Sequence, residues 1–234
     1  MNLSKMTRDM TEGSIAPKLL FFAFPIMFSS LFHLVYSLAD SLVVGRFIGG
    51  NALAAVSVTG NATYLMFSIS GGINMGSSVV LAQAYGARDQ KKMKQVISTS
   101  IVVLGITAVL FTLIGMLTAD LVLHIIQTPE EIYGMAKSYM MIIFAGTLGS
   151  VFYNWLASLL RAFGNSFVPL LCLIFSGILN VILDLAFVLG FGMGIEGAAL
   201  ATVLSQILSG SALLCLCLET VSRISSETGG MDPG

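Results

Sequence analysis

Charged residues divide the chain into uncharged blocks of membrane length. The uncharged blocks are 19–39, 47–87, 95–119, 138–160, 162–183 and 197–218. A helix rises about 1.5 Å per residue, so crossing about 30 Å of hydrocarbon takes roughly 20 residues. Each block is therefore long enough for at least one crossing. The predicted transmembrane helices are 19–46, 52–84, 95–118, 134–160, 166–190 and 197–218.

The composition agrees with an all-α membrane protein. Hydrophobic residues make up 56% of the chain and charged residues only 10%, whereas about a quarter of a soluble domain is charged. The mean hydropathy is +0.92. The expected organisation is an N-terminal segment (1–18), a six-helix transmembrane lobe (19–218) and a polar tail (219–234) that we expect to be disordered. The net charge of −1 gives no indication of nucleic-acid binding.

The distribution of basic residues predicts the orientation. If the N-terminus lies inside, only Arg46 and Lys137 of the eleven Lys and Arg residues fall on the outer side. Basic residues concentrate in cytoplasmic loops, so both termini are expected in the cytoplasm. The polar start before the first apolar run is long and lacks a cleavage pattern, and the first helix is therefore expected to be an uncleaved anchor.

The sequence contains no motif that indicates an enzyme. The stretch GMGIEG at 192–197 matches G-x-G-x-x-G, but helix-length apolar runs surround it instead of alternating strands and helices. We interpret it as a loop between two helices. No nucleophile elbow, paired-histidine metal motif or phosphate loop is present. His33 and His124 each stand alone, which favours structural roles, and no cofactor is expected.

Two acidic residues, Asp40 and Asp184, lie inside the apolar blocks. A charge at the centre of a bilayer costs about 2.5–3.5 kcal/mol on insertion scales, and such groups usually face the bundle interior and mark an ion or proton path. For Asp40 there is an alternative, because it could lie at the outer headgroup level near Arg46.

Counting along the helices places further polar residues at the same depth. Asn180 lies one helical turn before Asp184, hence on the same helix face. Thr202 lies shortly after the outer start of the last helix, at a height similar to those of Asp40 and Asp184. Two nearby carboxylates in a poorly solvated cavity can hold a proton near neutral pH. The same oxygens are also natural ligands for a hard cation such as Na⁺.

Four stretches of the chain resemble a known family of membrane transporters. They are FPIMFSSLFHLVYSLADSLVVGRFIGGNALAAVSV, QAYGARD, LRAFGNSFVP and NVILDLAFVLGFGMGIEGAALATVLSQ. Together they resemble the multidrug and toxic compound extrusion (MATE) family, especially its bacterial members, over nearly all of residues 10–218. The resemblance implies a secondary antiporter in a bacterial plasma membrane. Such a transporter exports organic, often cationic, drug-like compounds in exchange for H⁺ or Na⁺.

The resemblance also assigns roles to individual residues. The ion-coupling residues that it implies are Asp40, Asn180, Asp184 and Thr202, which would also be the ligands of Na⁺. In the family a proline bends the first helix during transport, and Pro25 matches it. A fixed kink without a cycle is the alternative, since a proline inside a helix permits a kink in either case. Tyr36 and Asn154 are expected to line the cavity.

The family consists of two six-helix lobes with the substrate path between them, and this chain supplies only the first lobe. The resemblance therefore implies a further partner, either a missing C-terminal lobe or a second copy of the chain. A related alternative within the MOP superfamily is a lipid-linked saccharide flippase. We would expect cationic residues along its cavity, whereas the predicted bundle has none between helix ends. A non-transporting membrane scaffold is the alternative of another class.

Overall fold

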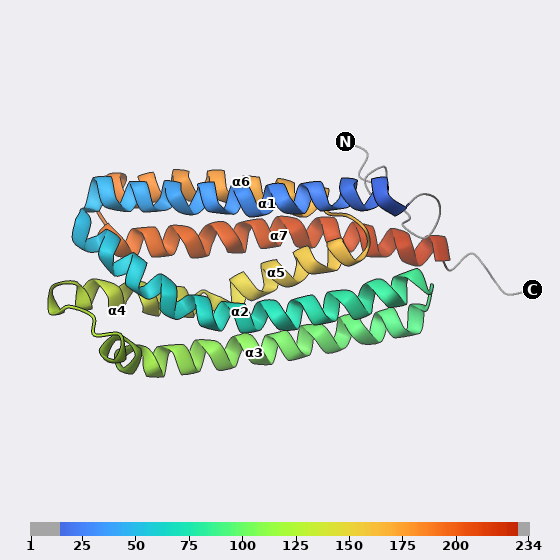
Figure 1. The fold of residues 1–234 in the computed structure, drawn as a ribbon, viewed down its shortest axis with the longest axis horizontal. Coiled ribbons are helices and arrows are strands. Elements are labelled where there is room, and N and C mark those ends of the chain that lie inside the picture. Colours follow the sequence, from blue (N-terminus) through green and yellow to red (C-terminus); the bar gives the residue numbers. More distant parts are fainter. Residues whose placement is uncertain (1–14, 229–234) are drawn as a thin grey trace, which may run out of the picture.

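The computed structural model describes residues 15–228 as an elongated bundle of helices (Figure 1). The elements are α1 (Ile15–Val43), η2 (Val44–Ile48), α2 (Gly50–Gly86), α3 (Gln90–Ile125), α4 (Glu130–Ala145), α5 (Thr147–Ala162), α6 (Phe167–Leu185), η3 (Ala186–Gly190) and α7 (Gly194–Thr228). The segments η2 and η3 are single π-helical turns that extend α1 and α6. The ends of the chain, 1–14 and 229–234, lie outside the described residues.

The prediction of a six-span helical membrane bundle is confirmed. Within the described residues, five helices are long and apolar enough to cross a membrane, and the bent pair α4 and α5 makes a sixth span if it is counted as one. The helix predicted over 134–160 is not continuous, because α4 and α5 meet at an angle of 49°. The last helix also continues through Thr228, so the boundary expected at residue 218 lies inside α7.

The break in the fourth span lies at Gly146. Its ψ angle of −3° departs from the value of about −42° that continues an α-helix. The backbone here packs directly on α7, and a Cβ atom on Gly146 would collide with the side chain of Val203. Close packing against a neighbouring helix therefore accompanies the bend. The local sequence alone does not predict this bend.

The connections define the two ends of the bundle. At one end, on the left in Figure 1, lie Gly49, residues 126–129 and residues 191–193, and we call this the Gly49 end. At the opposite end lie residues 87–89 and 163–166, and we call this the Asp89 end. Gly49 has a φ of 123°, a conformation that glycine adopts without steric cost. The carboxylate of Asp89 caps α3 by accepting from the Lys92 backbone N–H at 2.9 Å.

Helix α5 lies at the centre of the bundle, and most of its side chains are buried. Two clusters of buried hydrophobic residues contain parts of the surrounding helices, one toward each end of the bundle. Some polar side chains inside the core pair with each other, as where Trp155 Nε1 donates to Ser100 Oγ at 2.9 Å. Helices α6 and α7 approach closely, and Ser209 Oγ of α7 donates to the Cys172 carbonyl of α6 at 2.9 Å.

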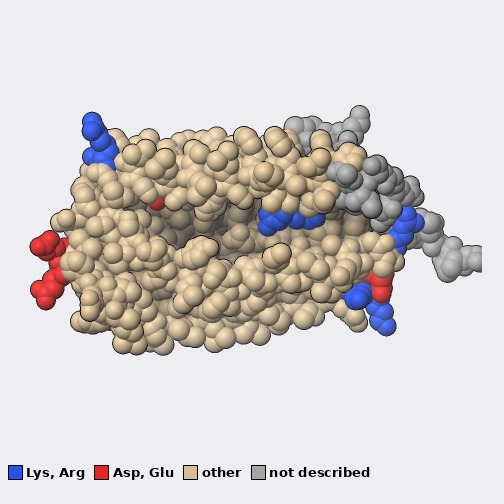
Figure 2. Space-filling view, in the orientation of Figure 1, with Lys and Arg blue, Asp and Glu red and all other residues tan. Residues whose placement is uncertain are grey.

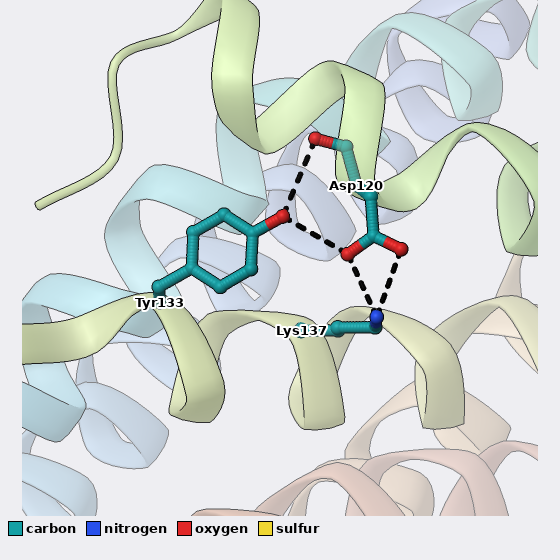
Figure 3. A network of polar contacts seen from close by, with 3 residues as sticks. All are labelled: Asp120, Tyr133 and Lys137. Atoms are coloured by element: carbon teal, nitrogen blue, oxygen red, sulfur yellow. Dashed lines mark hydrogen bonds and ion pairs between the residues drawn. The ribbon is translucent and has the colours of Figure 1, made fainter. Parts of the chain in front are cut away.

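A polar network joins α3 to α4 at the Gly49 end (Figure 3). Lys137 Nζ lies 2.7 Å from Asp120 Oδ1, and the Tyr133 hydroxyl donates to the same carboxylate oxygen at 2.9 Å. These exposed side chains connect two helices across the turn at residues 126–129. The network therefore holds the ends of α3 and α4 together, away from the centre of the bundle.

Candidate functional site

A pair of carboxyl groups lies between α1 and α6. The side chains of Asp40 and Asp184 lie close enough to interact electrostatically with each other. Asp184 is 0% exposed, while Asp40 is half-buried. In each side chain the Oδ1 atom is buried and accepts no hydrogen bond from the described residues. The pair can therefore take up a proton or a cation.

Asn180 and Thr202 complete this group. We assign the fully buried Asn180 amide with its nitrogen toward Asp184, because both polar atoms are then satisfied. In that orientation Nδ2 donates to Asp184 Oδ2 at 3.0 Å and Oδ1 accepts from the Thr202 backbone N–H at 3.2 Å. The Thr202 hydroxyl donates to the Ala198 carbonyl at 3.1 Å. Helices α1, α6 and α7 thus contribute one compact polar group.

Two tyrosines border the carboxyl pair. Tyr36, one helical turn before Asp40 on α1, has its hydroxyl beside the Thr202 side chain. Tyr139 of α4 lies close enough to both carboxyl groups to interact with them electrostatically. The phenol rings fill space around the acids and present hydroxyl groups that can donate to a carboxylate.

A glycine permits the close approach of α1 to α6. A Cβ atom on Gly177 would lie only 2.9 Å from Phe32 Cε1 and 3.6 Å from Tyr36 Cδ2, both on α1. Gly177 precedes Asn180 and Asp184 at helical spacing, so all three residues face the same side of α6. The small residue therefore brings Asp40 within reach of Asp184.

The carboxyl pair lies beside a cavity of about 1040 Å³. Side chains of α1, α2, α4, α5 and α7 line it, and Figure 2 shows the hollow between α1 and α2. Asp40, Tyr36 and Thr202 are part of this lining. Asn180 and Asp184 are not: Asp184 lies beside Asp40, and Asn180 lies between Asp184 and Thr202. Asp40 therefore lies next to both the cavity and the buried Asp184.

The structure brings together the four residues expected at the ion site, Asp40, Asn180, Asp184 and Thr202. Tyr36, which we expected to line the cavity, lies beside them and is part of the cavity lining. Asn154 also lines the cavity, but it lies on α5 and donates to the Ser150 carbonyl at 2.8 Å. Pro25 is buried within a continuous α1, and Ser29 Oγ donates to its carbonyl at 2.7 Å.

Two polar residues of this region were not expected from the sequence. Tyr139 belongs to α4, and no spacing along the chain relates it to the acids of α1 and α6. Gln206 lines the cavity and hydrogen-bonds with the Ser150 hydroxyl. Its position one helical turn after Thr202 is a signal that could have found it.

Comparison with known proteins identifies the family. A family model described as MatE matches residues 25–186. The chain belongs to the MatE family. This confirms the resemblance inferred from the sequence motifs, and it agrees with the absence of enzyme motifs, because MatE proteins are transporters. The chain is accordingly a multi-pass membrane protein.

Relatives of this MatE chain include multidrug transporters of bacteria. The probable multidrug resistance protein YpnP of Bacillus subtilis is 34% identical over 198 residues, which cover 85% of this chain and 44% of YpnP. The probable multidrug resistance protein YoeA of the same organism is 32% identical over 206 residues, which cover 86% of this chain and 44% of YoeA.

The fold is also found in a solved structure. A multidrug resistance MATE family transporter of the MOP superfamily, in an outward-facing conformation, superposes with a TM-score of 0.81 at 26% identity. The match covers 87% of this chain and 45% of that transporter. The chain thus spans about half the length of the relatives it matches and forms one lobe of the MATE fold.

Proposed function

We propose that this MatE lobe belongs to an antiporter that exports organic, often cationic, drug-like compounds in exchange for H⁺ or Na⁺. The observation that carries the proposal is the contact of Asp40 with both the cavity and the buried Asp184. Asn180 and Thr202 complete the proposed ion-coupling group. The names of the bacterial relatives support drug-like substrates.

The position of Asp40 explains how exchange would work. A proton held between Asp40 and Asp184 would cancel one negative charge and relieve the repulsion between the two carboxylates. When the proton leaves, the extra charge attracts an organic cation into the cavity beside Asp40. The cation and the proton therefore compete for the same carboxyl group, so that binding of one weakens binding of the other by the same factor.

The same group can hold Na⁺. Carboxylate, amide and hydroxyl oxygens suit a hard cation, and Asp40, Asp184 and Thr202 present such oxygens. In the assigned orientation, however, Asn180 Oδ1 already accepts from the Thr202 backbone N–H. A dehydrated Na⁺ would then need oxygens from outside these side chains, which gives the proton a slight advantage as the coupling ion.

The charges at the two ends of the bundle support an orientation in the membrane. The basic residues of the α2–α3 turn lie at the Asp89 end, and they are Arg88, Lys91, Lys92 and Lys94. At the Gly49 end, Lys137 is paired with Asp120. Because basic residues favour the cytoplasmic side, we place the Asp89 end in the cytoplasm and the Gly49 end outside a bacterial plasma membrane.

The coupling ion is tested by separating the two gradients. A full-length transporter that contains this lobe is reconstituted in vesicles, and export of a fluorescent organic cation is driven by a pH gradient or by a Na⁺ gradient alone. We expect export with the pH gradient. Full export with Na⁺ and no response to pH would assign the site to Na⁺, and no export under either gradient would favour a scaffold and contradict the proposal.

A further inference from the structure

Arg161 in the last turn of α5 lines the part of the cavity toward the Asp89 end. It also lines a second cavity of about 400 Å³ among α1, α5, α6 and α7. The described residues around this second cavity include no Asp or Glu, and the lining of the large cavity includes only Asp40. Basic atoms are visible inside the hollow in Figure 2. The two regions of the large cavity thus carry opposite charges.

The Arg161 guanidinium has few hydrogen-bond partners among the described residues. Its Nη2 atom donates to Ser158 Oγ at 3.2 Å. Across the described part of the chain the one salt bridge joins Lys137 to Asp120, so no carboxylate neutralises Arg161. A guanidinium carries five N–H donors in a fixed planar arrangement. Most of these donors are therefore available to a group that enters the cavity.

Neutral polar groups of α2 line the same cavity as the guanidinium. Ser78 Oγ of α2 donates to the Ser158 carbonyl at 3.3 Å, which brings α2 next to the Arg161 contact. One and two helical turns along α2 from Ser78 lie Asn74 and Ser70, which are 5% and 4% exposed and line the cavity. Asn74 Oδ1 and Ser70 Oγ are buried without a hydrogen-bond partner. These groups are placed to contact a polar ligand.

We propose that Arg161, with the neutral polar groups of α2 and α5 beside it, forms a subsite that binds a carboxylate or phosphate group. An arginine binds such planar or tetrahedral oxyanions through paired N–H donors. Asn74 can donate to the same ligand or accept from it, because an amide offers both functions. The subsite extends the proposed function, on which it rests, from purely cationic compounds to zwitterions and acids.

The test uses two dyes that differ in one charge. Tetramethylrhodamine carries a free carboxylate, and its methyl ester lacks that negative charge. The purified 234-residue chain is placed in phosphatidylcholine nanodiscs, and the Kd of each dye is measured by fluorescence anisotropy against empty nanodiscs. We expect the acid to bind about tenfold tighter than the ester, since hydrogen bonds to a charged group are worth about that much.

Variants assign the difference to Arg161. Arg161→Gln should weaken binding of the acid about tenfold and leave the ester within about twofold, because only the acid loses a charge-assisted contact. Arg161→Lys should retain part of the preference. Arg46→Gln is the matched control, because Arg46 is exposed at the Gly49 end and does not line either cavity. The comparison of the two dyes on the unmodified chain does not depend on the folding of any variant.

A second measurement distinguishes a carboxylate on a transported compound from the phosphate of a lipid. Native mass spectrometry counts phosphatidylglycerol retained by the chain and by Arg161→Gln. If the acid dye binds tighter than the ester and the difference depends on Arg161, the subsite binds a carboxylate on a transported compound. If the two dyes bind equally but the chain retains anionic lipid through Arg161, the subsite binds a lipid phosphate. Equal binding of acid and ester with no Arg161-dependent lipid overturns the subsite alone. Binding of neither dye and no such lipid contradicts the proposed function as well.

Discussion

At the scale of single residues, the two acids occupy different environments although they lie close together. Asp40 is half-buried and lines the cavity, whereas Asp184 is fully buried beside Asp40 and does not line the cavity. A substrate can therefore contact Asp40 directly, while Asp184 acts on it through the shared proton or cation. The two carboxylates are expected to respond differently to the same substitution.

We predict that Asp184→Asn abolishes ion-driven export while the protein still inserts into the membrane. The amide is nearly the same size, but it cannot share a proton with Asp40 as a carboxyl group does. The measurement is dye export from energised vesicles that contain a full-length transporter with this lobe. With the variant, export should fall to the level of empty vesicles. Asp120→Asn is the control, because Asp120 lies at the Gly49 end, away from the site. Unchanged export with Asp184→Asn would exclude a coupling role for this residue.

Much of the residue-scale arrangement could be predicted from the sequence. Helical spacing places Asn180 and Asp184 on one face, and counting from the helix starts gives Asp40 and Thr202 a similar height. The depth of a residue along its helix does not indicate which side chains of other helices point toward the centre of the bundle. Tyr139 and the cavity position of Arg161 depend on how α4 and α5 rotate and bend within the bundle, which needs the structure.

At the scale of helices, charge spacing predicts the long uncharged spans well but not the break between α4 and α5. A single glycine in an apolar run is compatible with a continuous helix, so Gly146 gives no clear signal. The break coincides with close packing of Gly146 against Val203, a residue far along the chain. Contacts between residues far apart in the sequence are not visible in local periodicity, so the break could not be predicted from it.

The contact of α1 with α6 is predicted to depend on Gly177. Leucine at this position would overlap Phe32, and overpacking typically destabilises by about 1–3 kcal/mol. Gly177→Leu should lower the midpoint of thermal unfolding in detergent, with Gly177→Ala in between. Gly105→Leu is the matched control on α3, where an added Cβ meets no atom within 4 Å. Equal effects of the two leucine substitutions would show that the contact of α1 with α6 is not tight.

The network of Asp120, Tyr133 and Lys137 is predicted to affect stability little. The side chains of its ion pair, Lys137 and Asp120, are exposed, and an exposed ion pair contributes little because water and salt screen it. Asp120→Asn should leave the unfolding midpoint close to that of Glu131→Gln, an exposed carboxylate at the same end. A large loss of stability that disappears in high salt would show that the network stabilises the fold instead.

At the scale of the whole molecule, one lobe presents an open hollow between α1 and α2 (Figure 2). The chain covers 45% of the solved MATE family transporter whose fold it shares. Alternating access in transporters built from repeats requires one half to move against the other around a shared site. If a second lobe, or a second copy of the chain, completes the path, we expect it to face this hollow.

We predict that residues 1–234 alone do not transport as a monomer. The ion-coupling group would still bind its ion, but no second lobe would close the cavity and carry the substrate from one side to the other. Ion-driven dye uptake is measured in liposomes containing the purified chain, together with its size after cross-linking. Two parallel copies related by an axis along the membrane normal could imitate two lobes, so any transport should appear only where dimers are trapped. Robust uptake by a demonstrated monomer would require a complete pathway through the single lobe, past Asp40 and Arg161, and would contradict the prediction.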